Sequence, residues 1–165
     1  MDFFYPNFNN DMWRIIGLAY WADKDFFVDL QHKTFRREAI IQQLETAGIA
    51  LYDVATTVNR LRGNASDKYL EIVSPTDLGT LLDQMPHCTA VVSTGQKSGE
   101  EVCRQFGTTL PQMGESTDFT HAGRTMKFFR MPSTSRAYPL PLTAKADYYK
   151  KMLIRTGCMP QQSTT

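Results

Sequence analysis

Helical and strand-like patterns alternate along this sequence, and that alternation is the feature that most limits its fold. Amphipathic helical patterns occur in five segments, residues 10–20, 34–45, 75–85, 98–106 and 143–155. Strand character occurs at 49–54 and 89–93, and a hairpin is predicted over 119–131. Gly48 and Gly107 follow two of the helices as C-terminal stops. Helices alternating with short buried strands favour a three-layer α/β/α sandwich with a mostly parallel central sheet.

Length and composition indicate one globular domain. The chain has 165 residues, of which 42% are hydrophobic and 21% charged, as in ordinary soluble proteins. We expect a single domain over residues 1–157 and a disordered C-terminal tail over 158–165. No apolar run approaches the length of a membrane span, and the N-terminus lacks a signal-peptide pattern. The sequence therefore predicts a cytoplasmic protein without membrane contact.

The charge balance limits how this chain could bind nucleic acid. A net charge of +1 gives no overall attraction for a polyanion, so a DNA-binding surface would have to be a local basic patch. The candidates for that patch are Arg124, Lys127, Arg130 and Arg136.

Cysteine and histidine usage argues against a metal site. Cys88, Cys103 and Cys158 are odd in number and widely spaced, with no Cys-x-x-Cys pair. The three histidines are isolated and show no helical metal-ligand spacing. We therefore expect neither a bound metal ion nor an iron–sulfur cluster, and we interpret the cysteines as reduced structural thiols.

The N-terminal segment combines aromatic rings with asparagines just before the first helix. Phe3–Trp13 contains Tyr5, Asn7 and Asn10, a combination that suits a pocket for a planar heterocycle such as a nucleobase. The same residues also fit a purely structural interpretation. In that case the rings anchor the segment in the core, an asparagine caps the helix, and Asp11 lies at its positive end. Both interpretations stay open.

Two polar loops follow predicted strands. Residues 94–99 place a Lys-Ser pair among glycines, but their spacing does not match a nucleotide phosphate-binding loop. Residues 132–138 combine Ser133, Ser135 and Arg136. Hydroxyls and backbone N–H groups in such a loop can hold DNA phosphates while the arginine enters a groove. A capped turn before the last helix is the structural alternative.

Three blocks of sequence stand in an informative order. Phe4–Arg14 places two aromatics before Asn-x-Met-Trp-Arg, Gly48–Val54 reads Gly-Ile-Ala-Leu-Tyr-Asp-Val, and Arg130–Ala137 reads Arg-Met-Pro-Ser-Thr-Ser-Arg-Ala. Together with the strand and turn at Val91–Lys97, these blocks resemble motifs of the uracil-DNA glycosylase superfamily. The similarity is closest to its mismatch-specific and hypoxanthine-type bacterial branches, and it runs from Phe3 to about Leu153.

The resemblance implies a DNA glycosylase of base-excision repair. Such an enzyme hydrolyses the N-glycosidic bond of a deaminated or mismatched base, here uracil or hypoxanthine, in DNA and without a cofactor. The resemblance also assigns roles to seven residues: Tyr5 and Thr94 in base binding, Asn10 and Asn7 in catalysis, and Ser133, Ser135 and Arg136 in DNA binding.

One family motif has no counterpart in this sequence. The family carries a strand that ends in Gly-x-x-Pro before the aromatic block, and its loop positions the attacking water. No such segment precedes Phe3 here. We therefore expect either a truncated or mis-started form of an active enzyme, or a degenerate relative. A degenerate relative would bind nucleic acid or a protein partner without turnover.

Overall fold

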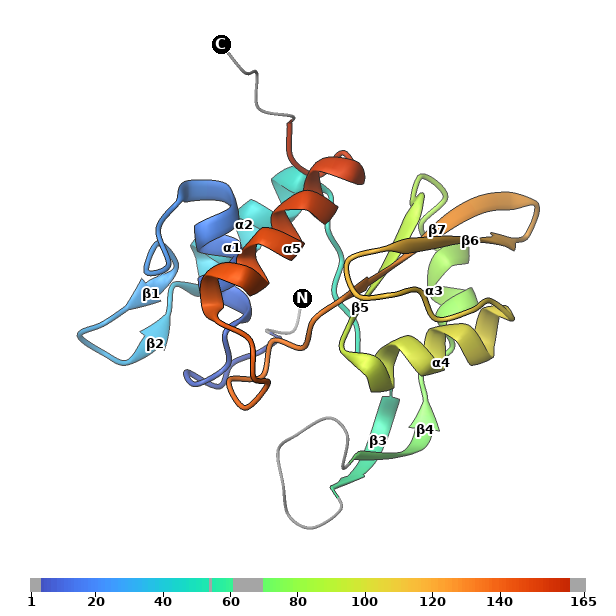
Figure 1. Cartoon of the computed structure of the whole chain (residues 1–165), viewed down its shortest axis with the longest axis horizontal. Helices are drawn as coiled ribbons and strands as arrows, with labels where there is room; N and C mark the ends of the chain where they lie inside the picture. The colour runs from blue at the N-terminus through green and yellow to red at the C-terminus, as the bar shows by residue number, and fades with distance from the viewer. Residues whose placement is uncertain (1–3, 54, 61–69, 161–165) are drawn as a thin grey trace. The chain divides into compact units, whose positions relative to one another are not determined.

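The computed structural model describes residues 4–53, 55–60 and 70–160, with the backbone alone for 55–60 and 70–75. These residues form two compact units (Figure 1). Unit 1 comprises Met1–Tyr52 and Thr134–Thr165, and unit 2 comprises Asp53–Ser133. Both units contain helices and strands, so the α/β class is confirmed. The single domain over 1–157 and the three-layer arrangement stay predictions.

Unit 1 is built from three helices and a short hairpin. Its elements are α1 (Met12–Trp21), β1 (Val28–Asp29), β2 (Thr34–Phe35), α2 (Arg37–Ala47) and α5 (Leu142–Arg155). Helices α1 and α5 pack side by side (Figure 1) and bury Ile15, Tyr149 and Leu153. The middle of α1 is buried almost without interruption because its sequence is apolar around most of the helix.

Local backbone chemistry sets the ends of the first two helices. Helix α1 ends at Ala22 in the left-handed conformation, and the chain then turns back across Gly17. A Cβ atom on Gly17 would lie 2.5 Å from the carbonyl oxygen of Asp23, so only glycine fits this turn. Helix α2 ends at Gly48 with a φ of 76°, which confirms the predicted stop.

Unit 2 contains a mixed three-stranded sheet and a separate hairpin. Its elements are β3 (Ala55–Arg60), β4 (Leu70–Pro75), α3 (Leu78–Asp83), β5 (Ala90–Thr94), α4 (Gln96–Phe106), β6 (Ser116–His121) and β7 (Arg124–Met131). Strand β7 is central in the sheet, parallel to β5 and antiparallel to β6. Strands β3 and β4 pair antiparallel with each other.

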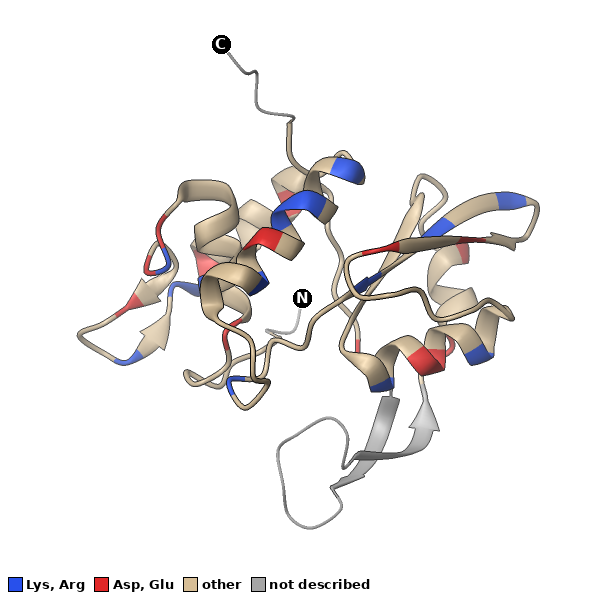
Figure 2. Ribbon diagram, viewed as in Figure 1, with Lys and Arg blue, Asp and Glu red and all other residues tan. Residues whose placement is uncertain are grey.

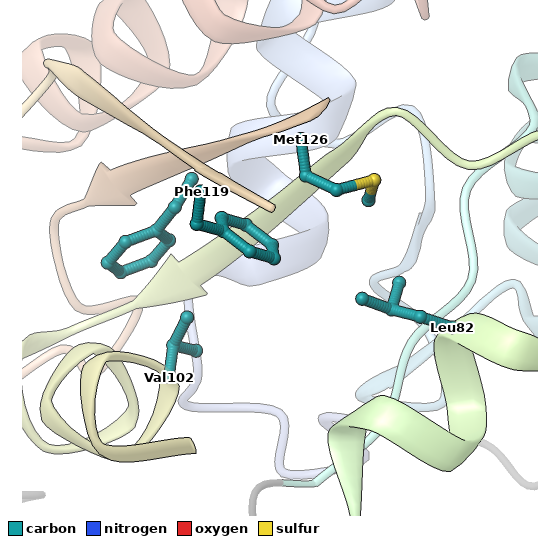
Figure 3. Packing of buried hydrophobic residues seen from close by; sticks show 5 residues of the cluster. Leu82, Val102, Phe119 and Met126 are labelled. Atoms are coloured by element: carbon teal, nitrogen blue, oxygen red, sulfur yellow. The ribbon is translucent and has the colours of Figure 1, made fainter. Parts of the chain in front are cut away.

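The core of unit 2 lies between this sheet and helices α3 and α4. Met126 and Phe128, two residues apart on β7, lie on one face of the strand. They pack with Phe119 of β6, Val102 of α4 and Leu82 of α3. Figure 3 shows four of these side chains converging from separate elements. All five residues are at most 7% exposed, so this cluster fixes the sheet against its helices.

The prediction of a mostly parallel sheet is wrong. Among the strand pairs in the described residues, only β5 and β7 run parallel. Strands β6 and β7 are joined by Ala122 and Gly123, whose φ angles are 50° and 79°. Such a two-residue turn with positive φ angles matches the twist of a hairpin and makes the two strands antiparallel.

Three predicted elements differ from the structure. The helix predicted over 75–85 is confined to Leu78–Asp83, and Pro75 belongs to β4. Residues 49–53 form no strand and Tyr52 is 55% exposed, while Val54 lies outside the described residues. The predicted helix over 34–45 begins only at Arg37, because Thr34 and Phe35 pair with β1 instead. A β-branched residue followed by an aromatic residue favours a strand over a helix at that point.

Part of the predicted disordered tail is packed. Met159 is 6% exposed, and the carbonyl oxygen of Cys158 accepts a hydrogen bond from the hydroxyl of Tyr20 at 2.7 Å. Residues 158 and 159 therefore belong to unit 1. Pro160 is exposed, and the rest of the predicted tail, 161–165, lies outside the described residues.

Candidate nucleic-acid interface

The seven predicted site residues are divided between the two units. Unit 1 contains Tyr5, Asn7, Asn10, Ser135 and Arg136, whereas unit 2 contains Thr94 and Ser133.

In unit 1, both predicted catalytic asparagines engage the backbone at the start of α1. The Asn10 Oδ1 atom accepts a hydrogen bond from the N–H of Met12 at 2.8 Å, and the Asn7 Oδ1 atom accepts one from the N–H of Asn9 at 2.9 Å. The N–H of Asn10 also donates to the carbonyl oxygen of Asn7 at 2.9 Å. These contacts form two consecutive side-chain turns just before α1, whose N-cap position is Asp11 and shows no side-chain cap hydrogen bond. Asn10 therefore has a structural contact at the start of the helix, and its catalytic role stays a prediction.

Tyr5 has an unusual backbone and an ordered ring. Its φ angle is 54°, in the left-handed region that costs a non-glycine residue about 1–2 kcal/mol. The ring lies edge-to-face on Trp13, with centroids 6.1 Å apart. The indole N–H of Trp13 also donates to the carbonyl oxygen of Phe4, the residue before Tyr5, at 3.2 Å. Backbone strain of this kind is concentrated at functional sites, which makes Tyr5 a candidate ligand contact.

The buried side chain of Arg14 donates hydrogen bonds to the backbone of the asparagine segment. Arg14 is 8% exposed, and its Nη1 atom donates to the carbonyl oxygens of Phe8 at 2.8 Å and Asn10 at 3.1 Å. The guanidinium also lies 4.7 Å from the ring centroid of Phe8 and 5.4 Å from that of Phe35. Burial, followed by the nearby charge of Arg136, lowers the pKa of Arg14. The sequence analysis missed Arg14, although a cation inside an apolar helical run was a usable signal.

The loop after residue 133 is tied to the start of α1 by a buried charge network. The N–H of Asp11 donates to the carbonyl oxygen of Thr134 at 2.9 Å. Lys145 of α5 is 1% exposed, and its Nζ atom lies 3.2 Å from Asp11 Oδ2 and 2.9 Å from the carbonyl oxygen of Ser135. The structure therefore brings Ser135 and the residues after it beside the asparagine segment.

Arg136 is the exposed member of this network. Its side chain is 54% exposed, and its Nε atom lies 3.5 Å from Asp11 Oδ1. Its Nη1 atom lies 3.5 Å from the Oδ1 of Asn9, which is 127 positions away in the sequence. Both contacts are long, so the guanidinium is held near the asparagines while it stays accessible to a phosphate.

In unit 2, Thr94 and Ser133 lie at the ends of two neighbouring parallel strands, β5 and β7. Thr94 ends β5 and is in register with Met131 of β7, and the N–H of Gly95 donates to the carbonyl oxygen of Met131 at 3.0 Å. Ser133 comes two residues later and is 8% exposed. Because parallel strands end at the same edge of a sheet, the structure brings these two residues to one edge.

Three of the four residues proposed for a basic patch have structural partners within unit 2. Arg124 donates to four backbone carbonyls around the end of α3, and Arg130 donates to the carbonyl oxygen of Pro111 at 3.2 Å. Lys127 pairs with Asp118 at 2.9 Å. Figure 2 shows basic and acidic residues on the elements of both units. Of the four candidates, Arg136 alone belongs to unit 1.

A groove of about 490 Å³ in unit 1 lies away from these residues. It is lined by the ends of α1 and α2 and by the segment after α5, including Tyr20, Trp21 and Cys158. None of the seven predicted site residues lines it.

Comparisons with family models, with curated proteins and with solved structures find no match to this chain. Within the described residues, no helix has both the length and the apolar character needed to cross a membrane. In the same part of the chain, no group of three or more His, Cys, Asp and Glu side chains is arranged to hold a metal ion. The three cysteines are free and half-buried.

Proposed function

We propose that this chain is a DNA glycosylase of the uracil-DNA glycosylase type, which removes uracil or hypoxanthine from DNA. The observation that carries the proposal is that residues 134–137 of the third motif block lie beside the aromatic and asparagine block in unit 1. The hydrogen bond from Asp11 to Thr134 and the contacts of Arg136 place the loop beside the aromatic and asparagine segment.

The surface formed in this way suits a nucleic acid with an extruded base. Arg136 supplies an exposed cation for a phosphate or for the gap left in the duplex. Tyr5 supplies a ring that Trp13 orients, and a base can stack on such a ring. Asn7 is exposed and Asn10 is half-buried.

The proposed reaction breaks the bond between the base and deoxyribose. The base leaves as an anion, and water adds to a sugar that has oxocarbenium character. The protein contributes orientation and electrostatic stabilisation, with Tyr5 holding the base and Asn10 orienting the water. For Thr94 and Ser133, base and phosphate contacts stay predictions from the resemblance.

A second candidate function is nucleic-acid binding without turnover. The observation that favours it is the use of the Asn10 Oδ1 atom as an acceptor for the N–H of Met12. An amide oxygen that already accepts a hydrogen bond from the backbone has less freedom to orient a water molecule. This alternative retains the DNA contacts of Tyr5 and Arg136 and omits the hydrolysis.

The decisive experiment measures base release and DNA affinity together. Duplexes with a central uracil, a central hypoxanthine or a matched pair are incubated with the wild-type chain, and free base is measured by chromatography. We expect release from one damaged duplex and tighter binding to it than to matched DNA. Binding preference without base release would favour the second function, and the absence of both would refute both.

Arg136→Ala tests the part of the proposal that concerns DNA. We expect this variant to lose affinity for damaged duplex more than for matched duplex, since a wedge residue acts where the base is extruded. Lys151→Ala is the matched control, because Lys151 is an exposed cation on α5 that pairs only with nearby Asp147 among the contacts described. An equal loss on both duplexes would make Arg136 a plain phosphate contact.

A further inference from the structure

Lys145 is the least expected charge in unit 1. It occupies the buried face of α5 together with Ala146, Tyr149, Met152 and Leu153, where the helical pattern calls for an apolar side chain. Replacing a buried ion pair with apolar residues often leaves a protein equally stable or more stable. Stability alone is therefore a weak reason for a lysine at this position.

Two contacts of the Lys145 side chain concern the loop that carries Arg136. Its Nζ atom donates to the carbonyl oxygen of Ser135 at 2.9 Å, and that oxygen also accepts from the N–H of Tyr138 at 3.0 Å. The Tyr138 ring centroid lies 5.9 Å from the same Nζ atom. The lysine thus holds the turn that presents Arg136.

Asp11 connects Lys145 to Arg136 electrostatically. One carboxylate oxygen faces Lys145 Nζ at 3.2 Å, and the other faces Arg136 Nε at 3.5 Å. With Lys145 present, the three side chains carry one net positive charge. Without it, Asp11 would face Arg136 with no lysine sharing the carboxylate, and a phosphate would have to compete with Asp11 for Arg136.

We propose that Lys145 is a positioning residue that neutralises Asp11 and so keeps the charge of Arg136 available to a DNA phosphate. This inference rests on the proposed function, in which Arg136 binds DNA. It adds that the DNA affinity of an exposed arginine is set by a buried lysine that never touches the nucleic acid.

The test is the salt dependence of binding to the uracil-containing duplex. Each phosphate contact contributes about −0.9 to the slope of log K against log salt concentration. Lys145→Met removes the charge, and we expect the slope to become shallower by about one such contact. Slope is a suitable readout because a smaller folded fraction lowers the amplitude of binding without removing a phosphate contact.

Two further variants separate this role from a purely structural one. Asp11→Asn/Lys145→Met removes both buried charges and restores one net positive charge through Arg136, so we expect the wild-type slope to return. Lys145→Gln removes the charge but retains hydrogen-bond donors, and it serves if Lys145→Met fails to fold. Lys151→Met, on the exposed side of the same helix, should leave the slope unchanged.

The outcomes distinguish this inference from the proposed function. A wild-type slope in Lys145→Met or Lys145→Gln would overturn the inference while the proposed function stands. A slope that stays shallow in Asp11→Asn/Lys145→Met would also overturn it, since neutralisation would then not be the cause. A wild-type chain with no measurable affinity for the damaged duplex would refute the proposed function and this inference with it.

Discussion

The Nη2 atom of Arg124 in β7 donates a 2.8 Å hydrogen bond to the carbonyl oxygen of Leu82 in α3. Its Nη1 atom reaches the carbonyl oxygens of Met85, Pro86 and Cys88 at 3.0 to 3.2 Å. The last carbonyls of a helix lack partners within the helix and carry partial negative charge. Arg124 satisfies this end of α3 and fastens the helix to the sheet.

Arg124→Met should therefore destabilise the protein. Hydrogen bonds to a charged group contribute about 1.5–3 kcal/mol each, and the overlapping contacts lead us to expect a total loss of about 2–4 kcal/mol. Lys127→Met is the matched control on the same strand, because its pair with Asp118 is exposed and should matter by less than about 1 kcal/mol. Urea unfolding measures both variants. Equal effects would show that the contacts of Arg124 are not what holds α3.

The sequence predicts those elements whose signals are local. Helices α4 and α5 have amphipathic patterns and α1 has a largely apolar one, and the structure places all three within a few residues of the predicted bounds. The β6–β7 hairpin also lies where it was predicted, because strand-like segments with alternating polar and apolar residues flank a turn at Ala122 and Gly123. Gly107 ends α4 in the left-handed conformation. A glycine directly after the last apolar residue of the helix, Phe106, predicts this stop.

Contacts between residues far apart in the chain could not be predicted from the sequence. Ile49 and Leu51 are half-buried while Ala50 and Tyr52 are exposed, which is the alternation of a strand, but a strand also needs a pairing partner. The pair of Asp11 and Lys145 joins residues 134 positions apart, and no local pattern matches a lysine to that carboxylate. The charge of Lys145 on an apolar helical face was a detectable anomaly without an evident partner.

Tyr20 should make stability fall at alkaline pH. Its hydroxyl donates to the carbonyl oxygen of Cys158, and burial, assisted by the nearby Cys158 thiol, raises the pKa of Tyr20 from 10.0 to about 12. Above pH 10 the unfolded chain therefore loses this proton while the folded chain keeps it. The unfolded state then binds fewer protons, and the free energy of unfolding falls as pH rises.

The measurement compares the melting temperature of the wild-type chain and Tyr20→Phe across the alkaline range. Tyr20→Phe starts lower because it lacks the hydrogen bond to Cys158, and its melting temperature should decline less steeply above pH 10. Parallel declines in the two proteins would show that another group causes the alkaline loss.

Glu101 should contribute to stability in the opposite pH range. It is 6% exposed, it pairs with Arg104, and it accepts a hydrogen bond from Gln105 at 3.3 Å. The hydrogen bonds from Arg104 hold the pKa of Glu101 below its usual value of 4.5, although burial opposes this shift. Its contribution to the free energy of unfolding is complete above pH 4.5 and is lost as the pH falls through the lowered pKa.

Glu101→Gln should therefore be less stable than the wild-type chain near neutral pH and approach it under acid conditions. Glu100→Gln is the matched control one position earlier on α4, where the glutamate is exposed and accepts only from Gln96 among the contacts described. Thermal unfolding from neutral pH to pH 3 distinguishes them, with pH 3 chosen as roughly one unit below the usual carboxylate range. A gap between wild type and Glu101→Gln that stays constant with pH would argue against a proton-linked contribution.

The two roles of Asn10 can be separated by a pair of substitutions. Asn10→Ala removes the hydrogen bond from the Met12 N–H and also removes the amide. It should therefore lower the free energy of unfolding by about 1 kcal/mol and also lower base release. Asn10→Ser retains an oxygen that can accept the same N–H, because serine is as good a cap as asparagine. Its melting temperature should therefore stay close to that of the wild-type chain.

Base release per folded molecule then decides what the amide does. If Asn10 orients the attacking water, Asn10→Ser should lower the rate of release more than it lowers DNA affinity, since a water-orienting group acts chiefly in the transition state. Single-turnover release from the uracil or hypoxanthine duplex measures the rate, and titration with the same duplex measures the affinity. A serine variant with both wild-type stability and a wild-type rate would leave Asn10 only its structural contact with Met12 at the start of α1, and the catalytic assignment would then have to move to Asn7.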